Sequence, residues 1–306
     1  MNNTRYTKIL FWNIRGINSQ EKWDAIKDKV SESACQVICL QETKRENFDI
    51  FYIKKFCPRN MDHFAFSPSI GASGGFLTAW NSSIFDGIVI QSNSYAITVK
   101  LSCRLDNKSF HVTNIFGPSH LTQKQGFITW LMNFDTSEFD DWLLAGDFNM
   151  IRPPENRNKP GGDLSEMNLF NEIISDLDLV EIPFNGRSYT WSNMHSDPLL
   201  VKLDWAFTSS GWTLSYPATH VQPLSRPTSD HIPYVLHIGS SIPKSNIFRF
   251  ENYWVDHADF LNTAVLHWNN SPVYANTSKN MSSKLKHVRA GLRNGAMAPF
   301  GLLNLG

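Results

Sequence analysis

The sequence has few cysteines, no long apolar run and no net charge, and the first two absences each exclude a class of protein. The four cysteines, Cys35, Cys39, Cys57 and Cys103, form no Cys-x-x-Cys pair and have no histidine at metal-ligand spacing. Neither a zinc site nor a disulfide framework is therefore indicated, and they are expected to be core thiols. No window approaches the roughly 18 to 20 apolar residues of a membrane span, and the N-terminal residues lack a signal-peptide pattern. We expect an intracellular protein with no membrane partner, and no protein partner is indicated.

The overall charge shows no preference for nucleic acid. Lys and Arg together number 28, as do Asp and Glu, so only a local excess of charge could attract a phosphate backbone. Such an excess occurs after Asp259, the last acidic residue. The basic residues that follow it are Lys279, Lys284, Lys286, Arg289 and Arg293. They fit either a solvated tail or a segment that contacts backbone phosphates.

Strand and helix patterns alternate along most of the chain. The expected elements are a strand at 6–14, a helix at 21–33, a strand at 35–43, a strand meander over 62–116, a helix at 123–134, a strand at 140–149, a helix at 164–182 and short strands of a second half between 188 and 238. The first three form a strand–helix–strand crossover unit. We expect two sheets.

A change of composition near residue 240 predicts a domain boundary. The segment IGSSIPKSN at 238–246 is typical of a linker. We therefore expect one α/β domain over residues 1–240 and a region at 241–306 that is partly helical or disordered. Length alone permits this division, because one large domain or two ordinary ones fit 306 residues.

Polar residues stand where the predicted strands end. They are Asn13, Glu42, Asp147, Asn149, Asp204, Ser229, Asp230 and His231. Each one alone fits a turn, because Asp and Asn side chains hydrogen-bond to nearby backbone. Together they fit phosphodiester cleavage, because carboxylate and amide oxygens are the ligands that Mg²⁺ prefers. Asn13, Glu42 and Asp230 suit that metal.

The remaining polar residues suit the other parts of such a reaction. Cleavage needs a water that is aligned and deprotonated, and charge stabilisation on the phosphoryl oxygens. Asp147 is expected to activate the water, with Asn149 orienting it. His231, held by the carboxylate of Asp204, is expected to address the phosphate.

Seven short segments carry a family resemblance: LFWNIRGIN, CLQET, VTNIFGP, LAGDFN, YTWSN, VKLDWAF and SDH, in this order. Over about residues 5–240 the chain resembles the endonuclease/exonuclease/phosphatase family, which is DNase I-like. It is most similar to the apurinic-endonuclease-like domain of plant LINE-type non-LTR retrotransposons. FRFENYW at 248–254 resembles the connector that precedes the reverse transcriptase of such elements, so 241–306 is expected to be the connector and tail of a truncated retroelement.

The resemblance implies a four-layer α/β sandwich, with two mixed β-sheets packed face to face and helices outside. It implies one site that uses Mg²⁺, with Mn²⁺ as an alternative, and DNA as the partner, which favours a nuclear location. It also implies metal binding by Asn13, Glu42 and Asp230. It implies activation of the water by Asp147 with Asn149, and binding of the phosphate by His231 with Asp204.

Two positions depart from the family pattern. Phe116 stands in NIFGP where the family generally has a tyrosine that hydrogen-bonds the scissile phosphate, so reduced activity is expected. Arg15 stands where the abasic-site repair enzymes have an aspartate, which favours the retroelement branch over the repair branch.

Further residues are expected to bind substrate. With Phe116 they are Thr190, Trp191, Ser229, Arg152, Arg157 and Lys159. Thr190 and Trp191 lie where the family places residues near DNA, although core packing explains Trp191 equally well. The three cations lie in a polar loop that fits either phosphate contacts or plain solvation.

The sequence therefore predicts a Mg²⁺-dependent phosphodiesterase, a DNA endonuclease that nicks one strand and leaves a 3′-hydroxyl. Two alternatives stay open. One is a phosphatase or RNA-cleaving enzyme of the same superfamily. The other is a catalytically weakened retroelement remnant that acts as a nucleic-acid-binding or inert protein.

Overall fold

The computed structural model describes residues 7–71, 73–137, 139–239, 255, 259–274 and 277–294. The chain forms two compact units, residues 1–242 and 243–306, and each is described by itself. The predicted connector FRFENYW lies outside the described residues, as does the predicted linker beyond Gly239.

The first sheet of unit 1 contains a parallel pair, β1 and β2, within a mixed sheet of order β13-β14-β1-β2-β4-β3. Its strands are β1 (Thr7–Asn13), β2 (Val37–Gln41), β3 (Met61–Ile70), β4 (Ser73–Asn81), β13 (His220–Pro223) and β14 (Tyr234–Ile238). Helix α1 (Gln20–Ser33) joins β1 to β2, which confirms the predicted crossover unit. Asn13 pairs with Gln41, so both strands end at one edge.

The second sheet also contains a parallel pair, β7 and β8, in the order β5-β6-β7-β8-β12-β9. Its strands are β5 (Phe85–Ser92), β6 (Ala96–Cys103), β7 (Ser109–Phe116), β8 (Trp142–Asp147), β9 (Leu179–Glu181) and β12 (Asp204–Ser209). Helix α3 (Leu121–Met132) joins β7 to β8. Asp204 at the start of β12 pairs with Asp147 at the end of β8.

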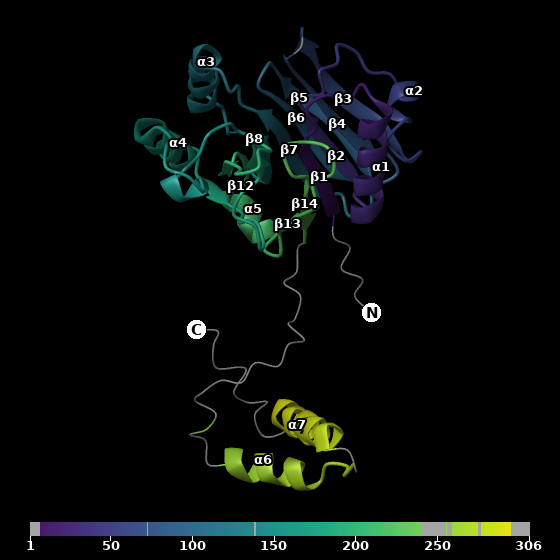
Figure 1. Ribbon diagram of the computed structural model, residues 1–306. Coiled ribbons are helices and arrows are strands. Elements are labelled where there is room, and N and C mark those ends of the chain that lie inside the picture. Colours follow the sequence, from purple (N-terminus) through teal and green to yellow (C-terminus); the bar gives the residue numbers. More distant parts are fainter. Residues whose placement is uncertain are drawn as a thin grey trace. The chain divides into compact units, whose positions relative to one another are not determined.

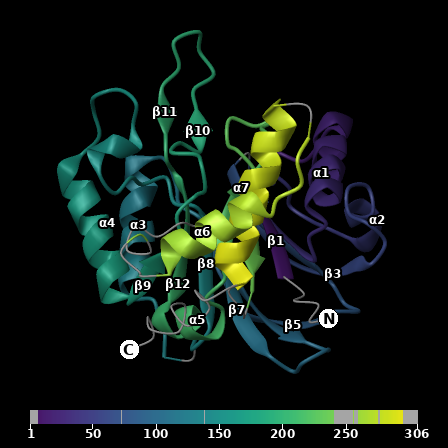
Figure 2. The same ribbon diagram turned by 90° about the horizontal axis from the view of Figure 1, so that it is seen from below.

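Three smaller helical segments and a two-stranded ribbon complete unit 1. They are α2 (Ile50–Ile53), the 3₁₀ turn η1 (Pro154–Asn156), α5 (Ser210–Ser215) and the ribbon of β10 (Trp191–Ser192) with β11 (Leu200–Val201). Figure 2 shows this ribbon extending into a long hairpin loop beyond the sheets.

The two sheets face each other, and helices cover their outer faces (Figure 1). Between the sheets, Phe11 and Val37 of the first sheet join one buried cluster with Val112 and Leu143 of the second. Outside the first sheet, α1 and α2 contribute to a second cluster. Outside the second sheet, α3 and α4 (Leu164–Asp176) contribute to a third cluster. This arrangement confirms the predicted four-layer α/β sandwich.

The division of strands between the sheets corrects the sequence prediction. The expected meander at 62–116 is split, with β3 and β4 in the first sheet and β5 to β7 in the second. The later strands do not form a half of their own, because β13 and β14 extend the first sheet while β9 and β12 extend the second. Alternation and turn signals predict that a strand exists, but pairing between distant strands depends on contacts that local patterns do not encode.

The helix expected at 164–182 also ends early. Helix α4 spans Leu164–Asp176, and Asp163 caps its first turn through hydrogen bonds to the Ser165 and Glu166 amides. Asp178 has a left-handed backbone with φ of 51°, which reverses the chain after the helix. Residues 179–181 form β9 instead, because they pair with β12.

The cysteines are free thiols, and three of the four are buried. This agrees with the expected core role. Burial raises the pKa of Cys35 to about 11, so this thiol stays protonated at neutral pH.

Unit 2 contains two described helices, α6 (Phe260–Asn269) and α7 (Thr277–Asn294). The five basic residues that follow Asp259 in the sequence all lie in α7. Lys284 donates a hydrogen bond to the Trp268 carbonyl oxygen of α6 at 3.3 Å. The phosphate contact expected of these residues stays a prediction. No described helix combines the length and apolar character needed to cross a bilayer.

Candidate active site

The motif LLAGDFNM carries β8 into a turn that aims two side chains at one place. Gly146 has a φ of +142°, and a Cβ there would lie 2.1 Å from the Ile115 carbonyl oxygen, so only glycine allows this approach of β8 to β7. Three residues later Asn149 is left-handed, with φ of 49°. Its backbone N–H donates to Asp147 Oδ1 at 2.9 Å, and its side-chain Nδ2 donates to Asp147 Oδ2 at 3.1 Å.

Left-handed residues other than glycine concentrate at this edge of the sheets. Among the described residues eight have positive φ, and four of them surround the site: Arg15, Glu42, Lys44 and Asn149. Such a backbone costs on the order of 1 kcal/mol at each residue, and such strained residues cluster at functional sites. The turns after β1, β2 and β8 thus hold polar side chains in positions that relaxed turns would not give.

Asn13 joins the two sheets at the site. Its Nδ2 donates to Asp147 Oδ2 at 2.8 Å and to Glu42 Oε1 at 3.1 Å. Asn13 and Asp147 are fully buried, and Glu42 is 8% exposed. The carboxyl ends of β1 and β2 therefore meet the carboxyl end of β8, which brings together three residues that the sequence predicted to act together.

His231 lies between two buried carboxylates. Its Nδ1 is 2.8 Å from Asp204 Oδ2, and its Nε2 is 3.4 Å from Asp147 Oδ2. Burial alone would lower the pKa of His231, but Asp204 and Asp147 outweigh it and raise this pKa to about 9. The imidazole is therefore protonated at neutral pH and donates from both nitrogens.

The Asp147 carboxylate accepts hydrogen bonds from Asn13 and Asn149, and its side chain is fully buried. Burial raises the pKa of Asp147 to about 7, whereas the charge of His231 and the hydrogen bond from Asn13 oppose this rise. The carboxyl group thus titrates near neutral pH, where a general base works best.

Thr190 and Ser229 position the residues around them. Thr190 Oγ1 accepts hydrogen bonds from the backbone N–H groups of Leu203 and Asp204, both at 3.0 Å. Ser229 Oγ donates to the Asn13 carbonyl oxygen at 2.7 Å. Both hydroxyls are buried, so in this structure they fix the ends of β12 and β1.

Arg15 binds the two carboxylates that were predicted to hold a metal. Its Nη1 donates to Asp230 Oδ2 at 2.8 Å, and its Nε lies 3.9 Å from Glu42 Oε2. Lys44 Nζ lies 3.6 Å from the same Glu42 oxygen. Asp230 also accepts a hydrogen bond from the Trp191 indole nitrogen at 2.9 Å. Arg15 thus lies beside both carboxylates, and Lys44 lies beside Glu42 alone.

Two groups of side chains could hold a cation. Asp147, Asp204 and His231 each offer one ligand atom, and these atoms lie within 4.8 Å of one another. The His231 ligand atom, however, is an imidazole nitrogen, whereas a hard divalent cation prefers oxygen. The oxygen donors around Glu42 and Asp230 fit a hard divalent cation better, because they already gather positive charge.

Replacing Arg15 by methionine is expected to tighten Mn²⁺ binding in the absence of DNA by about tenfold, equivalent to about 1.4 kcal/mol. The guanidinium competes for Glu42 and Asp230, so its removal frees both carboxylates. Calorimetric titration measures the affinity directly. The matched control is Arg157→Met, which removes a cation of the same cleft that touches no carboxylate. Equal or weaker Mn²⁺ binding by the Arg15 variant than by this control would contradict the account.

A cleft of about 710 Å³ opens above these residues. Asp147, Asn149 and His231 contribute to its floor, and Phe116 and Trp191 contribute to its walls. The Phe116 ring is 9% exposed and packs edge-on against Phe76 with centroids 6.4 Å apart. An open cleft with a buried polar floor can admit a phosphodiester while the reactive groups stay oriented by packing.

The three predicted loop cations lie in different surroundings. Arg152 donates to Glu181 and Asn171, both at 2.7 Å, and does not line the cleft. Arg157 lines the cleft, and Lys159 forms an ion pair with Asp197 at 2.6 Å.

Sequence reasoning missed Lys44, and it missed the ion pair of Lys124 with Glu166, at 2.7 Å in the cleft. Lys124 comes from α3 and Glu166 from α4. No local signal marks such a pair, because the two residues meet only when the helices pack.

Comparison with known proteins identifies the family. The sequence profile of the Endonuclease/Exonuclease/phosphatase family matches residues 10–231. The fold is similar to an AP endonuclease from Leishmania major, with a TM-score of 0.61 and 18% identity over 79% of this chain and 90% of that one. It is also similar to the endonuclease domain of TRAS1, a telomere-specific non-LTR retrotransposon, with a TM-score of 0.58 and 11% identity over 76% and 98%. An AP endonuclease from Archaeoglobus fulgidus is similar too, with a TM-score of 0.56 and 18% identity over 75% of this chain and 98% of that one.

Curated protein sequences contain no significant match. The profile nevertheless spans the buried polar cluster, from Asn13 to His231. The chain therefore belongs to the Endonuclease/Exonuclease/phosphatase family.

Proposed function

We propose that this chain is a Mg²⁺-dependent DNA endonuclease that nicks one strand and leaves a 3′-hydroxyl. The observation that carries the proposal is the buried cluster at the cleft floor, in which Asp147 touches Asn13, Asn149 and His231. A titratable carboxylate beside a cationic histidine is the pair that phosphodiester hydrolysis needs.

In the proposed reaction, Asp147 takes a proton from a water that Asn149 orients. The water oxygen forms a bond to phosphorus while the bond from phosphorus to the 3′ oxygen breaks. The products are a 5′-phosphate and a 3′ oxygen that takes up a proton as a hydroxyl. His231, held in place by Asp204, donates a hydrogen bond to the phosphoryl oxygen that gains charge.

Asn13, Glu42 and Asp230 would hold the Mg²⁺, with Mn²⁺ as an alternative. The bound cation would supply positive charge to the phosphoryl and leaving oxygens. Arg15, released from Glu42 and Asp230, is exposed enough at 43% of its side chain to reach a phosphate instead.

DNA as substrate is supported by the relatives, which include AP endonucleases and a retrotransposon endonuclease domain. Trp191, Arg157 and Lys159 are proposed to contact the DNA. We further propose that residues 1–240 form the endonuclease domain of a plant LINE-type element and that it acts in the nucleus. Residues 241–306 then correspond to the connector and tail.

A Phe116→Tyr variant is expected to nick DNA about 5- to 50-fold faster than the wild type, which corresponds to about 1 to 2 kcal/mol of transition-state stabilisation. Phe116 lines the cleft with Asp147, and its Cα pairs with that of Asp147 across β7 and β8. A hydroxyl there adds a donor for the phosphate. Single-turnover nicking of a plasmid gives the rate, and Phe76→Tyr, at the ring behind Phe116, is the control.

A weakened nuclease that serves as a DNA-binding protein is the second candidate, and Phe116 favours it. This function would show as DNA retention in gel shift without nicking by the wild type. Recovery of nicking in the Phe116→Tyr variant would then identify the missing hydroxyl as the cause. Hydrolysis of RNA or of a phosphomonoester in preference to DNA would favour another branch of the superfamily.

The chemistry of the nick tests the main proposal. Supercoiled plasmid is incubated with the protein and Mg²⁺, or with EDTA, and the nicked product is offered to a DNA polymerase with a labelled nucleotide. The proposal expects nicking only with Mg²⁺ and direct extension from each nick. Nicks that need a phosphatase before extension would carry a 3′-phosphate and refute the proposed bond cleavage.

A further inference from the structure

A second groove lies beside the catalytic cleft and shares one wall with it. It has a volume of about 510 Å³ and is lined mainly by residues 186–191 and by Ser225 and Arg226. Trp191 lines both the groove and the catalytic cleft. The Trp191 backbone forms an antiparallel β-bridge with His231, and the Trp191 indole nitrogen donates a hydrogen bond to Asp230. The ring is therefore fixed as the partition between the two spaces.

The groove is cationic. Arg187 and Arg226 line it, and no Asp or Glu side chain does. Within the described part of the chain, neither arginine forms an ion pair with a carboxylate. Arg226 Nη1 donates to the Asp230 carbonyl oxygen at 3.2 Å, which anchors the guanidinium and leaves its other N–H groups for a ligand.

Behind Ser225 there is a further cation. Lys29 Nζ donates to Ser225 Oγ at 2.7 Å and to Glu32 at 2.6 Å. The Ser225 hydroxyl oxygen therefore accepts a hydrogen bond from a cation behind the groove. The groove therefore offers several donors and few acceptors, which is the chemistry of a phosphate-binding surface.

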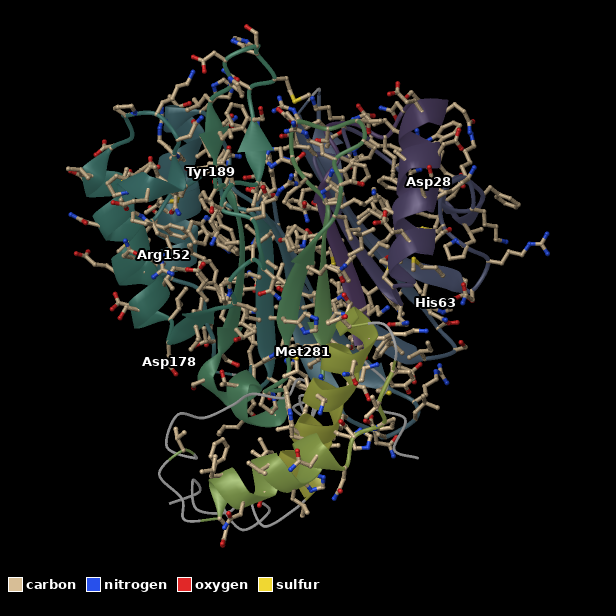
Figure 3. All side chains as sticks on the ribbon, turned by 60° about the horizontal axis from the view of Figure 1, so that its bottom comes forward. Asp28, His63, Arg152, Asp178, Tyr189 and Met281 are labelled. Carbon is tan, nitrogen blue, oxygen red and sulfur yellow. The ribbon has the colours of Figure 1, made fainter. Side chains whose placement is uncertain are left out.

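The groove is also aromatic. Tyr189 and Trp191 are both half-buried and line it together with Leu200 and Ile232. Figure 3 shows Tyr189 in the part of unit 1 from which the β10–β11 hairpin extends. Aromatic rings beside arginines accept unpaired nucleotides, because the base stacks on a ring while the phosphate meets the cation.

From this combination we infer that the groove binds an unpaired DNA nucleotide next to the nick site on the strand that crosses Trp191. The inference rests on the proposed function, since a strand in the catalytic cleft would supply the nucleotide. A fully paired duplex cannot offer a base face to Tyr189, so the groove favours DNA with a local gap or melted step over continuous duplex.

The experiment measures DNA binding without cleavage. Fluorescence anisotropy in EDTA compares two labelled probes, a duplex with a short single-stranded gap and the same duplex without the gap. Tyr189→Leu is expected to weaken binding of the gapped probe by about tenfold and to change binding of the continuous duplex by less than about twofold. Arg187→Gln is expected to weaken both and to reduce the salt dependence, d log K/d log[salt], by about one.

The matched control is Arg59→Gln, because Arg59 is an exposed arginine that lines neither groove. The inference would be overturned by two results together. Tyr189→Leu would bind both probes with the wild-type affinity, and Arg187→Gln would bind them with the affinity of Arg59→Gln. A gapped probe whose unpaired nucleotides are ribonucleotides is compared with the DNA probe. Tighter binding of the ribonucleotide probe would overturn the assignment to DNA. Tyr189-dependent binding in a protein that does not nick plasmid would support the groove and reject only the proposed function.

Discussion

An Asp147→Asn variant is expected to nick DNA at least about 10³-fold more slowly than the wild type, the combined value of a general base and of a fixed charge at the reacting centre. The asparagine keeps the shape of the side chain but removes the proton acceptor. Asp147 lies at the meeting point of β1, β8 and the SDH turn, and the neighbouring Asp204 carboxylate is held by His231.

The same residue predicts how the wild-type rate depends on pH. Because the pKa of Asp147 is raised to about 7, the base is ionised above this pH and becomes protonated below it. The nicking rate is therefore expected to fall by about tenfold per pH unit below pH 7. Single-turnover rates between pH 5 and about pH 8 measure it. A rate that stays level down to pH 5 would show that another group activates the water.

DNA affinity distinguishes loss of chemistry from loss of structure. In EDTA the Asp147→Asn variant is expected to bind DNA as tightly as the wild type, because Asp147 is fully buried below the cleft. A parallel loss of affinity and rate would point to a damaged fold. Asp178→Asn, a change in a left-handed turn remote from the cleft lining, serves as the control for expression and folding.

His231→Ala and Asp204→Ala are each expected to slow nicking by about 10² to 10³, and the double variant is expected to be no slower than the worse single one. The 2.8 Å hydrogen bond makes the two residues one unit. Without Asp204 the imidazole loses its fixed orientation and the charge that raises its pKa. Without His231 the Asp204 carboxylate has nothing to orient.

A double-mutant cycle of nicking rates measures this coupling. Rates that multiply, so that the double variant loses about 10⁴ or more, would mean that the two residues act independently. The ratio of the wild-type rate to the Asp204→Ala rate is also expected to shrink as the pH falls, because the imidazole of the variant is then protonated without help. It separates an electrostatic role of Asp204 from a purely packing role.

Local sequence patterns predicted the parts of the site that neighbouring strands assemble. Asn13 and Glu42 end two strands of one crossover unit, and parallel strands bring their carboxyl ends to the same edge. Asp147 and Asn149 belong to a single turn. The family resemblance supplied the link between these pieces and His231.

The remaining contacts depend on long-range packing. Arg15 was read as a departure from a family motif, whereas the structure places its guanidinium on Asp230, 215 positions away. The sequence predicts that Arg152 contacts phosphate, and in the structure it pairs with Glu181 on β9, a strand within the span that the sequence predicts as a helix. Charge and loop position predict that an arginine will find an anion, and the fold decides which one.

The most direct test of the central claim is a side-by-side nicking assay. Supercoiled plasmid and Mg²⁺ are incubated with the wild type, with Asp147→Ala and with His231→Ala, and open circles are quantified. The account predicts that the wild type produces open circles and that each variant does so at least about 10²-fold more slowly. Mg²⁺-dependent nicking at close to the wild-type rate in both variants would contradict it.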